Sequence, residues 1–175
     1  MSASEHLSVG FLSVHEIAEL GAVGGYLILN AVGRPLEFHC TTPVRANRAQ
    51  EILYGTTLRP VLYGEQIATA LCRKQKSQPR FLLTDNEFVA AVRMNVELPT
   101  ALLLADSAAL PNPALWVEMN IGDYRLAIWK RYAQDEPIIT AAIDEQLGHL
   151  DLTEPFGRIH EALEETQKSV RPAAA

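Results

Sequence analysis

The chain has 175 residues, of which 48% are hydrophobic and 21% charged, and its formal net charge is −6 at pH 7. A chain of this length and composition can bury a core without disulfides or metals, so one soluble domain is expected. No apolar run approaches the roughly 20 residues of a membrane-spanning helix. The acidic balance argues against general nucleic-acid binding, because neutralising phosphates takes a basic surface.

The cysteines and the first residues bear on location. Neither Cys40 nor Cys72 has a second cysteine two residues away, which excludes a CxxC redox pair and a zinc knuckle. Both are expected to be buried free thiols. The opening MSASEHLSVG lacks the basic region and apolar core of a secretory signal. These features predict a cytoplasmic protein.

The first third of the chain predicts a group of strands. Apolar residues at 9–14 and 26–32 indicate two buried strands, and residues 15–20 either continue the first or form a helical turn. A turn at Gly33 leads to a third strand at 35–41, in which polar and apolar side chains alternate. The alternation places one set toward the core (Leu36, Phe38 and Cys40) and the other on the opposite face (Glu37, His39 and Thr41).

Two helices are predicted to follow. Thr42 suits the N-cap, and Pro43 suits the first helical position, where its missing N–H costs nothing. Gly55 is expected to end this helix with a positive φ. A second helix should begin at Thr56 or Thr57 and bury an apolar stripe.

The rest of the chain alternates short elements. A linker at 73–79 precedes a strand at 80–84, a helix at 86–94 and a buried strand at 100–104. Strands at 116–121 and 124–131 form a hairpin that turns at Gly122. Two helices then begin at similar sequences, with Asp135 and Thr153 as capping side chains. This order predicts an α+β fold, a mostly antiparallel sheet with helices packed on it, forming a single compact domain over residues 1–169 with a flexible tail at 170–175.

Charge is unevenly distributed along the chain. From Arg34 to Arg80 there are eight basic and three acidic residues, a net charge of +5, which leaves −11 for the remainder. Two interpretations stay open: the two sets of charges pair across the folded surface, or the basic segment forms a local anion site.

The anion-site hypothesis centres on the predicted helix start. Thr42, Arg45 and Arg48 would bring a hydroxyl and two guanidiniums to free backbone N–H groups, which suits a phosphate or a carboxylate. Helical spacing would place the two arginines on one face. Alternatively, both arginines pair with Glu51 or with the acidic C-terminal helices.

Glu37 and His39 are the candidate acid–base pair, because they share one face of the strand at 35–41. The same pair could be half of a metal site, or an exposed polar patch. His39 cannot serve Cys40 as a base, since neighbours on a strand point to opposite faces. No nucleophile-elbow, zinc-protease or phosphate-loop motif occurs, and no two of the five histidines lie three or four residues apart. No metal, cofactor or catalytic residue is assigned.

The features together predict a non-catalytic binding or assembly domain, which self-associates as a homodimer or other homo-oligomer or binds an acidic protein partner. The alternative is an enzyme acting on a small anionic substrate. In that case Glu37 or His39 would be the acid or base, and Arg45 and Arg48 would anchor the substrate. No general nucleic-acid binding and no membrane association are expected.

Overall fold

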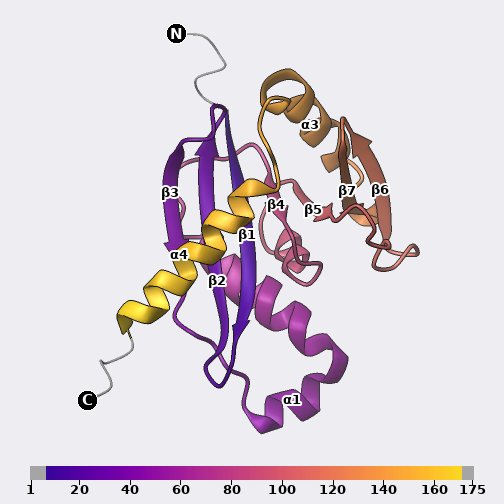
Figure 1. Cartoon of the computed structure of the whole chain (residues 1–175). Helices are drawn as coiled ribbons and strands as arrows, with labels where there is room; N and C mark the ends of the chain where they lie inside the picture. The colour runs from indigo at the N-terminus through magenta and orange to yellow at the C-terminus, as the bar shows by residue number, and fades with distance from the viewer. Residues whose placement is uncertain (1–6, 171–175) are drawn as a thin grey trace.

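A seven-stranded mixed sheet forms the centre of the protein in a computed structural model that describes residues 7–170 (Figure 1). Its strands follow the order β3-β2-β1-β4-β5-β7-β6. Their bounds are β1 Ser8–Ile17, β2 Gly21–Asn30, β3 Pro35–Cys40, β4 Leu82–Thr84, β5 Thr100–Leu104, β6 Trp116–Ile121 and β7 Tyr124–Trp129. β1, β4 and β5 run parallel, and every other neighbouring pair is antiparallel. The predicted α+β class with a mostly antiparallel sheet is confirmed.

Helices cover both faces of the sheet. One face carries the π-helix η3 Pro60–Ala68, α2 Thr69–Cys72 and the 3-10 helix η4 Val89–Met94. The preceding α1 Arg48–Tyr54 and the 3-10 turn η2 Gly55–Thr57 bury no residue. The other face carries α3 Asp135–Ala142, the π-helix η6 Ile143–Leu147 and α4 Glu154–Val170. A short 3-10 turn, η5 Lys130–Tyr132, links β7 to α3. Figure 1 shows α4 lying across β1 and β2.

Two large apolar clusters, and a smaller third one that includes Leu104 and Trp116, fill the interior. Phe11, Leu27 and Leu83 pack under α3 and α4 with Ile159 and Leu163, whereas the second cluster lies under η3 and η4 and includes Leu12, Tyr26, Ile67, Leu71 and Leu82. Alternate residues of one strand supply opposite clusters, as the two-residue period of a strand requires. β1 is therefore buried on both faces, and it organises the rest of the fold.

Gly24 and Gly25 lie inside β2, although the sequence pattern placed them before a strand at 26–32. A Cβ on Gly24 would come 2.3 Å from Ile67 of η3, and a Cβ on Gly25 would come 2.5 Å from Ile159 of α4. Helices press on both faces here, so only residues without side chains fit. β1 likewise continues through residue 15, to Ile17.

The helix predicted to begin at Thr42 begins at Arg48 instead. Asn47 caps it, and Gln50 completes a capping box. Residues 41–47 stay extended because Val44 exchanges two backbone hydrogen bonds of 2.8 Å with Ala22 of β2. α1 buries none of its residues, and Ile52 and Leu53 are exposed on it.

Several local predictions are confirmed. Gly55 has φ of 52° and follows the last residue of α1, and Gly122 turns the β6–β7 hairpin with φ of 56°. Cys40 and Cys72 are free thiols, and burial raises the pKa of the Cys72 thiol to about 12. Cys40, however, is only half-buried, and Leu36 and Phe38, which were expected to face the core with it, are exposed on the edge strand β3. No helix among residues 7–170 is long and apolar enough to cross a membrane. Of the predicted tail at 170–175, all but Val170, the end of α4, lies outside the described residues.

Candidate functional site

Glu37 and His39 do meet on β3, with 2.8 Å between Glu37 Oε2 and His39 Nε2. Glu37 also accepts the backbone N–H groups of Lys76, at 3.0 and 3.1 Å, and of Ser77. The hydrogen bonds from Ser77, His39 and Lys76 lower the pKa of Glu37 to about 2. A carboxylate held ionised by several donors is a weak base, so its contacts favour a structural role as a latch for the linker after α2.

Thr42, Arg45 and Arg48 do not converge on a helix N-terminus, because the helix begins after the first two. Arg45 lies in the extended segment and donates to the Glu19 carbonyl at 3.1 Å. Arg48 forms an exposed ion pair with Glu51 at 3.1 Å, as the pairing alternative predicted. The expected pair of free arginines is therefore wrong for Arg48. A ligand at these residues stays a prediction.

The sheet topology draws attention to a different place. The chain leaves β1 toward β2 and β3 on one side, then returns to β4 and β5 on the other side. In open sheets, ligands bind outside the carboxyl ends of parallel strands at such a reversal. β1 and β4 run parallel with Leu12 beside Thr84, so the carboxyl end of β4 brings Asp85 next to Ser13 and His15, which lie in the longer β1.

Ser13, His15 and Asp85 form a hydrogen-bonded chain at this point. The Ser13 Oγ donates to Asp85 Oδ1 at 2.6 Å, and it lies 3.1 Å from His15 Nε2. Because the hydroxyl proton points to the carboxylate, His15 donates its Nε2–H to the Ser13 oxygen. Ser13 is only 1% exposed, whereas His15 is half-buried and Asp85 keeps exposed surface. The buried hydroxyl thus connects two groups that reach solvent.

The proton affinities of the two outer groups approach each other. Burial lowers the pKa of His15, and the Asp85 carboxylate partly opposes that fall. Surrounding protein atoms raise the pKa of Asp85 by desolvation, and the hydrogen bond from Ser13 opposes that rise. Solvent contact screens the Asp85 charge and limits the free energy involved. Convergent pKa values at one place are typical of acid–base sites.

α4 closes one side of the site. The His160 ring lies 4.8 Å from the His15 ring, centroid to centroid, at an angle of 54°. His160 Nε2 in turn lies 3.2 Å from Glu164 Oε1. A groove of 410 Å³ runs between the end of β1 and this helix, and both histidines, Glu164 and Lys168 line it. Within residues 7–170, no three histidine, cysteine or carboxylate side chains are placed to hold one metal ion.

Sequence reasoning treated these residues as unrelated. His15 was one of five scattered histidines and Asp85 lay between a predicted strand and helix, while Ser13 carried no signal of its own. Because side chains alternate along a strand, the sequence could have placed Ser13 and His15 on one face of β1. Their proximity to Asp85 depends on the parallel register of β1 and β4, and the local pattern does not contain it.

No protein-family model matches the chain, and no curated protein matches it. Among solved structures, human ENDOV is 12% identical with a TM-score of 0.49, covering 94% of this chain and 86% of that one. Two crystal structures of Ciona intestinalis Endonuclease V, in complex with DNA containing an inosine followed by a ribo-adenosine, are 13% and 15% identical, with TM-scores of 0.41 and 0.40. Both alignments cover 63% of this chain, which spans about half of the Ciona chains (50% and 51%).

These matches correct three sequence-based predictions. The non-catalytic binding or assembly domain, the homo-oligomer or protein partner, and the absence of general nucleic-acid binding all disagree with neighbours that are named as endonucleases, two of them bound to DNA. The likeness is distant, however, in both identity and TM-score. It assigns no activity, substrate or catalytic residue to this chain.

Proposed function

We propose that this chain is an enzyme whose acid–base site lies where β1 and β4 end. His15 is the group that takes a proton from the substrate and returns it. Ser13 and Asp85 position the imidazole and stabilise its charged form. The hydrogen-bonded chain from His15 Nε2 through Ser13 Oγ to Asp85 Oδ1 is the observation that carries this proposal.

The orientation of His15 follows from that chain. An imidazole that donates from Nε2 has its lone pair on Nδ1, so Nδ1 accepts the substrate proton. Among the described residues, none forms a hydrogen bond to Nδ1. The positive charge that forms on His15 faces a carboxylate through one hydroxyl, in the way that a carboxylate orients the base of a catalytic triad. Ser13 is too deeply buried to act as a nucleophile.

The groove indicates the kind of substrate. Its 410 Å³ suits a small molecule or one unit of a polymer. Lys168 supplies a positive charge along α4, whereas Glu16 of β1 and Glu164 of α4 supply negative charges, and Glu164 lies beside His160. The alternative reached from the sequence, an enzyme with an acid–base group, therefore keeps its class, but the charges of the groove do not single out an anionic substrate. The proton-transferring role moves from Glu37 or His39 to His15, which Ser13 and Asp85 position.

Activity measurements test the site directly. Purified protein would be incubated with nitrophenyl esters, nitrophenyl phosphate mono- and diesters, and inosine-containing oligonucleotides. We expect turnover of at least one substrate, with a loss of about 10²- to 10⁴-fold in His15→Ala, since a general acid or base contributes that much. His149→Ala, an exposed histidine outside the groove, is the matched control. Unchanged turnover in His15→Ala would remove His15 from the mechanism.

A titration of His15 tests whether the Asp85 carboxylate acts on the imidazole or only lies near it. The Asp85 carboxylate favours the charged imidazole, so Asp85→Asn should lower the pKa of His15 further. The chemical shifts of the His15 ring, followed by NMR from pH 4 to pH 8, measure this change. A His15 midpoint that is identical in wild type and Asp85→Asn would show that the carboxylate does not act on the imidazole.

A further inference from the structure

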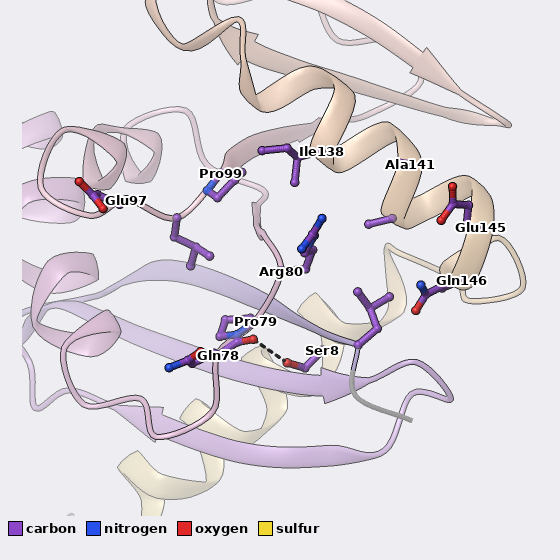
Figure 2. Close-up of a pocket in the computed structure, with 13 residues that line it drawn as sticks. Ser8, Gln78, Pro79, Arg80, Glu97, Pro99, Ile138, Ala141, Glu145 and Gln146 are labelled. Carbon is purple, nitrogen blue, oxygen red and sulfur yellow. Dashed lines mark hydrogen bonds between the residues drawn. The ribbon is translucent and has the colours of Figure 1, made fainter. Parts of the chain in front are cut away.

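A second cavity lies at the opposite end of the parallel strands from the proposed acid–base site. It has a volume of 570 Å³ and opens where β1 and β4 begin and where Pro99 leads into β5 (Figure 2). α3 and η6 form its far wall through Ile138 and Gln146. Neither the acid–base proposal nor the sequence patterns use this cavity.

Arg80 is the basic residue that lines the cavity. Figure 2 shows its guanidinium standing in the open space between Ser8 and Ile138. The backbone holds this residue in place, because the Arg80 N–H donates to the Ser8 carbonyl at 2.8 Å and the next residue continues toward β4. Among residues 7–170, no side chain forms an ion pair or hydrogen bond with the guanidinium. An arginine so placed has five donors available for a planar anion.

The walls restrict what that anion can be. Half-buried Leu98, Pro99 and Ile138 offer apolar surface on the way to Arg80. Glu97 and Glu145 lie at the two ends of the cavity and would repel a ligand carrying several negative charges. A single carboxylate on an apolar body fits both features better than a phosphate, which carries nearly two charges near neutral pH.

One more atom favours a polar ligand. Gln146 Oε1 lies beside the cavity, and among residues 7–170 it is the one buried side-chain oxygen or nitrogen that lacks a hydrogen-bond partner. A buried acceptor without a donor costs free energy. An N–H or O–H on the ligand next to its carboxylate would remove that cost after a small rotation of the amide.

We propose that this cavity is a second binding site, for a small monocarboxylate with an apolar body. The carboxylate pairs side-on with the Arg80 guanidinium, and the apolar body lies against Ile138, Leu98 and Pro99. Recognition is by one charge-assisted pair and apolar burial, and no bond is made or broken. The site does not depend on the acid–base proposal, because it shares no residue with the groove at α4.

Matched probes test the carboxylate. 4-Methylpentanoate and its neutral isostere 4-methylpentanamide would be titrated into the full chain, with binding followed by amide NMR shifts and calorimetry. We expect the acid to bind at least about tenfold more tightly than the amide, since a charge-assisted hydrogen-bonded pair is worth 1.5 kcal/mol or more. The largest changes in amide chemical shift should occur at Arg80, at Ile138 and at the residues next to Pro99. Equal binding of the two probes, or no binding of the acid at about 10 mM, would overturn the proposal.

Variants assign the site. Arg80→Met should weaken 4-methylpentanoate binding about tenfold or more, whereas Arg73→Met, at an exposed arginine outside the cavity, should leave it unchanged. Ala141→Leu keeps Arg80 and places a larger exposed side chain at the cavity wall, so it should also weaken binding without disturbing the core. His15→Ala should bind like wild type. Retained affinity in both Arg80→Met and Ala141→Leu would overturn the proposal, whatever the outcome at His15.

Discussion

At the scale of single residues, Glu37 shows how one side chain fastens a linker to an edge strand. Its carboxylate gathers the Lys76 and Ser77 backbone N–H groups and the His39 ring, and its side chain is 13% exposed. The hydroxyl of buried Tyr26 holds the same linker by donating to Gln75 Oε1 at 2.7 Å. The predicted solvated linker at 73–79 is therefore attached to the sheet, and a residue chosen for catalysis is explained by structure.

Glu37→Gln should lower the free energy of unfolding by about 1 kcal/mol at pH 7, because three partly exposed donors lose a charged acceptor. The folded pKa of about 2 lies below the ordinary value of 4.5, so the carboxylate stabilises the fold above about pH 4.5 and less as the pH falls toward 2. The variant should accordingly lose less stability than wild type between those pH values. Urea unfolding at several pH values measures both effects.

Glu161→Gln, at an exposed glutamate of α4, is the control for that experiment. It should unfold like wild type at every pH. If Glu37→Gln and Glu161→Gln have the same pH dependence, the proposed latch does not exist.

At the scale of elements, the sequence Leu-Tyr-Gly occurs twice, at 53–55 and 62–64, and its two glycines have different structural roles. Gly55 ends α1 at positive φ, and no other heavy atom lies within 4 Å of where its Cβ would be. Gly64 is buried inside η3, where an added Cβ would come 2.5 Å from Ala91 Cβ and 2.7 Å from the Phe88 carbonyl oxygen. Gly64 therefore sets the separation between η3 and the segment of η4.

Gly64→Ala should destabilise the protein by about 1 to 3 kcal/mol, because the added methyl group meets a backbone oxygen and forces two packed helices apart. Gly157→Ala, in α4, is the matched change, since its Cβ would meet no heavy atom within 4 Å. That change should be neutral or stabilise by up to about 1 kcal/mol through helix propensity. Thermal melts of both variants measure the difference, and similar melting temperatures would show that η3 and η4 do not pack this closely.

At the scale of the whole molecule, a buried ion pair joins the helices of the two faces. Arg93 of η4 forms two hydrogen bonds with Asp135 of α3, at 2.8 and 3.1 Å, and the side chains are 13% and 2% exposed. Asp135 also accepts the Thr100 N–H at 3.2 Å, at the start of β5. The residue that the sequence suggested as a helix cap thus connects η4, β5 and α3.

Asp135→Ala should cost about 3 to 5 kcal/mol, because it leaves a largely buried guanidinium without its partner. The double variant Arg93→Met with Asp135→Ala should cost less than Asp135→Ala alone, since no buried charge remains. Glu154→Ala, which breaks the exposed pair with Arg158, should cost about 1 kcal/mol or less. Urea unfolding of the variants measures these costs, and a double variant less stable than Asp135→Ala would contradict this account.

Local patterns predicted much of the fold. The strand at 100–104, the hairpin strands at 116–121 and from 124, the helix that begins at Asp135 and the positive φ of Gly55 all agree with the structure. Each depends on interactions between residues a few positions apart, such as alternation, turn chemistry and capping. The helix expected from Thr42 failed because a partner distant in sequence, Ala22, held residues 41–47 extended.

What the sequence by itself determined was most of the list of elements and the alternation of side chains along the strands, although on the edge strand β3 the side expected in the core is exposed at Leu36 and Phe38. Only the tertiary structure decided that β1 pairs with β4, which brings Ser13 to Asp85 across 72 positions of sequence, and that α4 packs across β1, which brings His160 to His15. The contacts of Glu37 likewise depend on the tertiary structure, since its partners Lys76 and Ser77 lie 39 and 40 residues away in the sequence. The physical reason is that a local pattern encodes a side chain's direction, whereas its neighbours across the sheet depend on how all the apolar faces are buried together.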